Sequence, residues 1–194
     1  MKKLSLVIAL CAFVAFTSSA QKFQLGVKGG LNFPSKDAFG FDGDGISASG
    51  WHAGVFGLLK VSKFGVQPEL LYSSFVFSDD DVDVDTDLNY LTVPIIGKFY
   101  LVQGINVQAG PQFGFLLNSE TEGGGLTIDN SDALKGSDLS IAVGAGADLP
   151  FGLQVSARYL IGVSDINDVS GATESINTST FQVSLGYALV KLGL

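Results

Sequence analysis

The sequence predicts an all-β fold, an eight-stranded antiparallel up-and-down transmembrane β-barrel. Three observations predict it: an alternation of apolar with small or polar residues that recurs eight times, an export signal ahead of it, and connections that alternate between short and long. Successive side chains of a strand point to opposite faces, so each segment has one apolar face and one polar face. Apolar faces toward lipid and polar faces toward the interior are typical of bacterial outer-membrane barrels.

Residues 1–20 have the features of a cleavable secretory signal peptide. Lys2 and Lys3 give a positive start, residues 4–16 are apolar, and Ala20 ends a cleavage site of small residues. The apolar stretch is shorter than the ~20 residues of a membrane-spanning helix, which argues against an uncleaved anchor. Cys11, the only cysteine, lies within this segment. We therefore expect residues 21–194 to form one barrel domain that has no disulfide.

Eight segments of the mature chain show the alternation, and the last shows it most clearly. There Phe181, Val183 and Leu185 alternate with Gln182 and Ser184. A period of two is the pattern of a strand with unlike faces. The predicted strands are residues 22–33, 51–61, 64–77, 90–100, 105–117, 138–149, 153–163 and 180–192.

The connections between these strands alternate in length. Outer-membrane barrels have short turns at the periplasmic end and long loops at the outer end. The order of lengths therefore predicts which end of the barrel faces outward. The short turns are 62–63, 101–104 and 150–152, and the long polar loops are 34–50, 78–89, 118–137 and 164–179.

Aromatic residues gather near the ends of the predicted strands. Two belts of aromatic side chains at the two membrane interfaces would explain this, although aromatic residues also favour strands in general. The belt near the long loops is predicted to hold Phe33, Trp51, Phe75, Tyr90, Phe115 and Phe181, and the belt near the short turns Phe23, Phe64, Phe99 and Phe151.

Three prolines, Pro68, Pro94 and Pro111, fall inside predicted strands. A proline removes one hydrogen bond from the ladder, and a closed barrel has no edge strand where that loss would go unnoticed. We expect local β-bulges at these three positions.

The acidic residues of the predicted strands all fall on the inward face, and four basic residues do so as well. An eight-stranded barrel is just wide enough inside for side chains to fill it, so opposite charges there would satisfy one another. Phe56, Leu58 and Leu160 would fill the rest, which predicts no solute-sized pore; a proton or ion path is the alternative. The predicted interior charge network consists of Lys28, Lys60, Glu69, Lys98, Asp138, Asp148 and Arg158.

The acidic residues outside this network lie in the long loops, most densely in the loop 78–89. Alternate carboxylates could bind a divalent cation such as calcium, but Thr86 stands where a calcium-binding EF-hand loop needs glycine. The loop is either a solvated acidic tip or a site where divalent ions bridge to lipopolysaccharide. Its candidate ligands are Asp79, Asp81, Asp83, Asp85 and Asp87.

Few residues could support catalysis. His52 is the only histidine, and Ala53 and Gly54 follow it, so the His-x-Ser spacing of some outer-membrane enzymes is absent. We expect no enzyme and no cofactor; a lipid-modifying enzyme would need a serine within hydrogen-bonding reach of His52. The formal net charge of −8 repels phosphate and excludes nucleic acid as a partner.

Four motifs resemble a known family. The segments 26–32, 67–73 and 90–94, together with Gly110 and Pro111, are similar to the small outer-membrane β-barrel domain family of Bacteroidota, often described as PorT-like. The resemblance implies the barrel fold along the mature chain. Because some PorT-like relatives assist protein secretion, it also implies a role as an accessory component of secretion across the outer membrane.

Together these features predict an integral outer-membrane protein of a Gram-negative cell envelope. We expect a structural or surface-interaction role through the acidic loops, with secretion as the alternative. Its expected partners are outer-membrane lipid, lipopolysaccharide and the barrel-insertion machinery, in addition to an unknown partner at the surface.

Overall fold

A computed structural model of the protein describes residues 21–34, 46–79, 84–123, 126–129, 137–163 and 179–193. The predicted signal peptide lies outside the described residues, as do Asp81 and Asp83 of the acidic loop.

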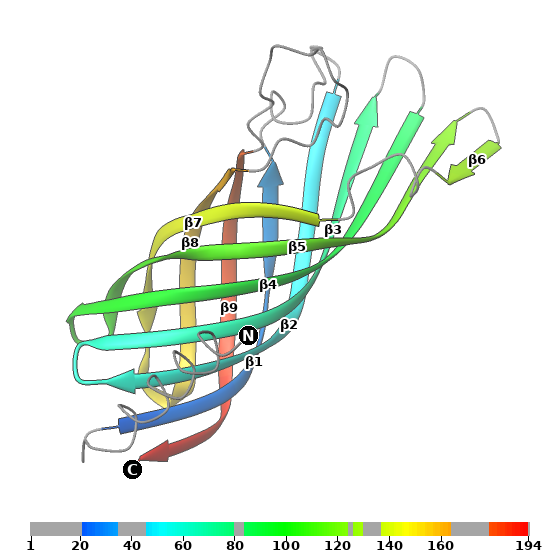
Figure 1. The fold of residues 1–194 in the computed structure, drawn as a ribbon. Coiled ribbons are helices and arrows are strands. Elements are labelled where there is room, and N and C mark those ends of the chain that lie inside the picture. Colours follow the sequence, from blue (N-terminus) through cyan, green and yellow to red (C-terminus); the bar gives the residue numbers. More distant parts are fainter. Residues whose placement is uncertain are drawn as a thin grey trace, which may run out of the picture.

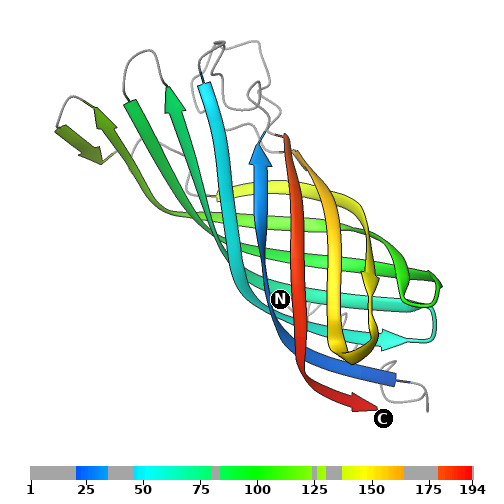
Figure 2. The same cartoon turned by 180° about the vertical axis from the view of Figure 1, so that it is seen from behind.

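Eight long antiparallel strands close into a barrel, as the alternation predicts (Figure 1 and Figure 2). The first strand, β1 (Gln21–Pro34), pairs with the last, β9 (Ser179–Gly193), and this pairing closes the sheet. The other barrel strands are β2 (Ile46–Val61), β3 (Phe64–Asp79), β4 (Val84–Val102), β5 (Ile105–Gly123), β7 (Ser137–Asp148) and β8 (Leu153–Gly162), and a short strand, β6 (Leu126–Asp129), pairs with β5 outside the barrel wall.

Side chains alternate between the outside and the inside of the barrel along every strand. On β9, Leu185 is 57% exposed on the outer face, whereas the neighbouring Ser184 is 3% exposed inside. The outer face carries many exposed aliphatic and aromatic residues, which suits contact with lipid. A single-turn 3-10 helix, η3 (Pro150–Gly152), joins β7 to β8. Within the described residues, no helix is both long and apolar enough to span a membrane.

Aromatic pairs occupy the outer face near both ends of the barrel. The rings of Trp51 and Tyr72 are 5.6 Å apart near the long loops, and those of Phe64 and Phe99 are 5.1 Å apart near the short turns. These positions agree with two interfacial belts.

Two residues assigned to the outer belt, Phe75 and Tyr90, instead belong to the inner face. Phe75 pairs with the buried Leu88 and Tyr90 with the buried Ser73, and both aromatic residues are half-buried. Directly paired residues share a face of the sheet. The prediction was wrong here because the period of two, and not nearness to a loop, determines which face of the sheet a side chain takes. The two rings meet edge to face at 6.1 Å inside the barrel mouth.

The prolines are accommodated without bulges, so that prediction was wrong. Beside Pro68, the β2–β3 ladder skips two residue pairs, yet Phe56 pairs with Glu69 and Leu59 with Val66 in one unbroken register. The β3–β4 ladder beside Pro94 and the β4–β5 ladder beside Pro111 are interrupted in the same way. Each missing N–H opens a short gap, and pairing on both sides of the gap keeps the strands aligned.

Strands β2 to β5 extend farther beyond the outer end of the barrel than predicted, as Figure 1 shows. Val84 already pairs with Gly123, so much of the predicted loops 78–89 and 118–137 is strand. The sequence signal was present, since Asp83, Asp85 and Asp87 alternate with Val84 and Thr86. High acidic content favours a loop, but here the period of two prevails, so the predicted loop bounds were wrong.

Candidate functional site: the polar interior and the extracellular sheet

Three charged side chains meet at the centre of the barrel. Lys28 projects inward from β1, Glu69 from β3 and Arg158 from β8. The Nζ atom of Lys28 lies 3.0 Å from Oε1 of Glu69, and the NH2 atom of Arg158 lies 2.7 Å from the same oxygen. The three residues therefore lie at a similar depth inside the barrel. We call them the central ion cluster.

Amide side chains form further hydrogen bonds with the central ion cluster. Arg158 donates through NH1 to Oε2 of Glu69 at 3.0 Å and through Nε to Oε1 of Gln108 at 2.8 Å. Gln67 donates from Nε2 to Oε1 of Glu69 at 2.7 Å. A bidentate arginine–carboxylate pair is stronger and more directional than a neutral hydrogen bond. The cluster therefore ties β1, β3, β5 and β8 together across the lumen.

The other predicted network residues lie apart from the central ion cluster. Lys98 forms a 3.0 Å ion pair with Asp148 toward the periplasmic end, where Tyr100 also donates to Asp148. The Nζ atom of Lys60 lies 3.4 Å from the centre of the Tyr100 ring. Asp138 is half-buried on β7, where it pairs with Gly114. Among the described residues, the ion pairs named above thus centre on two carboxylates, Glu69 and Asp148.

Apolar side chains and glycines fill the space around these charges. Phe56 and Leu58 pack with Ala188, and Phe56 is 2% exposed. A Cβ atom added at Gly26 would lie 2.6 Å from the Phe56 ring, so only glycine leaves room for it.

His52 lies in a second polar cluster, closer to the outer end of the barrel. Its Nδ1 atom is 2.8 Å from Oδ1 of Asn32, and its Nε2 atom is 2.9 Å from Oγ of Ser184. Gln182 donates to the same Asn32 oxygen at 2.9 Å. Because Oδ1 can only accept, Nδ1 carries the proton and Nε2 accepts the hydrogen of the serine hydroxyl.

The sequence did not reveal this serine–histidine contact. Ser184 is 132 positions away from His52 and comes from the opposite end of the chain. The two meet because β1 lies between β2 and β9, so closure of the barrel brings their strands together. The period of two places both residues on the inner face of the barrel. It does not show how far along the barrel axis each one lies.

Acidic residues occupy paired positions on the sheet that extends beyond the barrel. Asp85 pairs with Glu122, Asp87 with Glu120, and Glu120 in turn with Asp129. Residues directly opposite one another in an antiparallel ladder share a face, and like charges placed so repel each other. This acidic register of β4, β5 and β6 is the part of the predicted acidic loops that the structure describes. Within the described part of the chain, no group of three or more His, Cys, Asp or Glu residues is placed to hold a metal ion.

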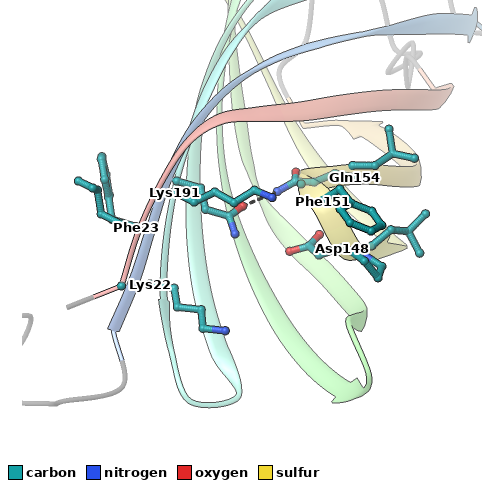
Figure 3. A pocket seen from close by; sticks show the side chains of 13 residues that line it. Lys22, Phe23, Asp148, Phe151, Gln154 and Lys191 are labelled. Atoms are coloured by element: carbon teal, nitrogen blue, oxygen red, sulfur yellow. Dashed lines mark hydrogen bonds between the residues drawn. The ribbon is translucent and has the colours of Figure 1, made fainter.

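A cavity of about 350 Å³ opens at the periplasmic end, between the start of β1, the end of β9 and η3 (Figure 3). Asp148 and Gln154 lie on one side of it and Lys22 on the other, and the side chain of Lys191 reaches from β9 toward η3. Phe23 adds an apolar wall. The cavity exists because the β8–β9 ladder ends at the pair of Leu153 with Tyr187, while β9 continues to Gly193.

The match to a known protein family agrees with this architecture. Residues 18–168 match the family described as "Outer membrane protein beta-barrel domain". Among solved structures, Neisserial surface protein A is 11% identical, with a TM-score of 0.47, and the match covers 91% of this chain and 98% of that one. The attachment invasion locus protein Ail of Yersinia pestis, solved with the heparin analogue sucrose octasulfate, is 15% identical with a TM-score of 0.48, over 89% of this chain and 99% of that one. No curated protein sequence matches.

Proposed function

Because this chain belongs to the outer membrane protein β-barrel domain family and is an outer-membrane barrel, we propose that it acts at the cell surface, in a structural or surface-interaction role. In this role the barrel is a filled membrane anchor, and the binding surface is the sheet that extends outward from it. The observation that carries the proposal is the acidic register on β4, β5 and β6.

The acidic register favours a cationic partner. The paired ladder positions concentrate negative formal charge on this sheet, and a bound cation would neutralise part of that charge. Divalent ions that bridge these positions to lipopolysaccharide, and basic segments of a surface partner, both supply such charge. Calcium is the hard cation best suited to carboxylate oxygens.

The test uses the protein in lipid vesicles and a fluorescent oligolysine peptide as the cationic probe. We expect the wild-type protein to bind oligolysine with an affinity that falls as salt is raised, because exposed charges are screened. Replacement of Asp85, Asp87, Glu120 and Glu122 by their amides is expected to weaken binding at least about tenfold, which is about 1.4 kcal/mol.

The matched control removes the same charge from other predicted outer segments, through amide substitutions at Asp37, Asp42, Asp44 and Asp165. This control is expected to bind oligolysine nearly as well as the wild-type protein does. Equal losses in the two variants would show that only net charge matters and would contradict a site at the acidic register.

The second candidate role is that of an accessory in protein secretion, which the periplasmic cavity favours because it offers charged and apolar groups on the inner side of the membrane. In a deletion strain this role predicts loss of exported proteins from the medium. Normal export in that strain, together with oligolysine binding by the purified protein, would favour the surface role.

A further inference from the structure

We propose that Ser184 and His52 form an acyl-transfer site, with Asn32 as the positioning residue, inside the outer half of the barrel. The substrate class is an acyl ester of an amphiphile that enters from the extracellular side. This activity goes beyond the surface role and replaces the expectation that the chain has no catalytic residues.

The geometry is that of an activated serine. A nucleophilic hydroxyl needs a general base within about 2.6–3.2 Å, and that base needs a third group to hold its orientation. Here Ser184 Oγ is 2.9 Å from Nε2 of His52, and Asn32 holds Nδ1 at 2.8 Å. Gln182 fixes the Asn32 amide by donating to its oxygen. The proton is thus on Nδ1, and Nε2 is free to take the serine proton.

A purely structural role explains this arrangement less completely. Asn32 is 0% exposed, yet its Nδ2 atom has no hydrogen-bond partner among the described residues. A buried donor without an acceptor destabilises the protein, and a packing role does not recover that cost. The carbonyl or ether oxygen of an ester would supply the missing acceptor.

The fold makes room for the histidine at this level. A Cβ atom added at Gly30 would lie 2.7 Å from Cε1 of His52, so the glycine admits the imidazole ring. Ser156 provides a useful contrast, because it pairs directly with Ser184 across the β8–β9 ladder and is also buried. In the described residues, the serine within hydrogen-bonding distance of His52 is Ser184.

The position of the site determines which substrates can reach it. The central ion cluster lies on the periplasmic side, since Lys28 pairs with Gly186 one step beyond Ser184 on the inner face. Access from the periplasm is therefore closed. Asn32 is two residues from the outer end of β1 at Pro34, so an outer-leaflet lipid or another extracellular acyl ester has the shorter path. Ser184 is 3% exposed, so entry requires side chains nearer the outer end of the barrel to move.

The reaction balances without a cofactor. The Ser184 oxygen bonds to the acyl carbon while His52 Nε2 takes the hydroxyl proton. The bond from the acyl carbon to the ester oxygen then breaks, and the leaving alcohol takes that proton from His52. Water attacks the acyl-serine, His52 receives its proton and returns it to the serine, and the products are a carboxylic acid and an alcohol.

The test exposes the full-length protein, folded in detergent micelles, to a fluorophosphonate probe. An activated serine displaces fluoride from phosphorus and gains a covalent phosphonyl group. We expect the folded wild-type protein to gain one such group, located on Ser184 by mass spectrometry, and to release nitrophenolate from a nitrophenyl ester. Both rates are expected to fall at least about 100-fold in Ser184→Ala and His52→Gln.

Ser156→Ala is the matched control and should label like the wild-type protein. Asn32→Asp keeps an acceptor for Nδ1 and should retain labelling within about tenfold, whereas Asn32→Ala should lose about 100-fold; equal labelling of the two would overturn the positioning role. If Ser184→Ala does not fold, mass spectrometry of the labelled wild-type protein still tests the proposal, because it identifies the modified residue. Folded wild-type protein without a label, or labelled at any serine other than Ser184, would overturn the proposal.

Discussion

Replacing Glu69 by glutamine is expected to lower the free energy of unfolding by about 3–5 kcal/mol, the usual cost of leaving buried charge uncompensated. Glu69 and Lys28 side chains are 0% and 3% exposed, and Arg158 is equally enclosed. Without the carboxylate, two cations would face each other with no anion in contact. Urea unfolding in lipid vesicles, followed by the gel mobility of unheated samples, measures this loss.

Two variants make this prediction specific. The pair Glu69→Gln with Lys28→Met removes one of the two cations, and it should be more stable than Glu69→Gln alone by about 1 kcal/mol. Asp148→Asn breaks a pair whose carboxylate side chain is 16% exposed, so its loss should be smaller. A Glu69→Gln protein as stable as the wild-type protein would mean that the central ion cluster does not hold the barrel together.

Replacing Leu185 by arginine is expected to lower the free energy of unfolding in vesicles by about 2–4 kcal/mol. Leu185 is on the outer face near the middle of β9, where the membrane is most apolar. Leu189 is the matched control, because it lies on the same face four residues nearer the periplasmic end. Leu189→Arg should cost only about 0–1 kcal/mol, since its charge can reach the interface.

The difference between these two variants measures depth in the membrane. Equal costs for Leu185→Arg and Leu189→Arg would show that lipid does not surround this strand. If Leu189→Arg failed to fold while Leu185→Arg folded, the apolar centre of the membrane would lie at the level of Leu189. That result would contradict the depth assigned to the two residues.

The period of two allowed the barrel wall to be predicted from the sequence. It gave the inward positions of Lys28, Glu69 and Arg158, and their contact followed because each lies midway along its strand. By the same rule, Phe75 and Tyr90 belong on the inner face, although both lie near the long loops. The alternation along the strands therefore predicts most of the fold, including the inner-face positions of Phe75 and Tyr90.

What could not be predicted depended on register between distant strands. The contact between His52 and Ser184 requires two ladders to align through β1, and no local pattern encodes that alignment. The prolines show a related limit. A lost hydrogen bond can be absorbed by a bulge or by a gap, and the choice depends on the pairing that flanks Pro68, Pro94 and Pro111.

The central claim is that this outer-membrane barrel has a filled interior and serves as an anchor, not as a pore. Current recordings from the purified protein in planar lipid bilayers test it most directly. The central ion cluster, Phe56 and Leu58 occupy the lumen, so we expect no stable, solute-sized open state. Steady conductance comparable to that of a porin would contradict the filled lumen and the role assigned to it.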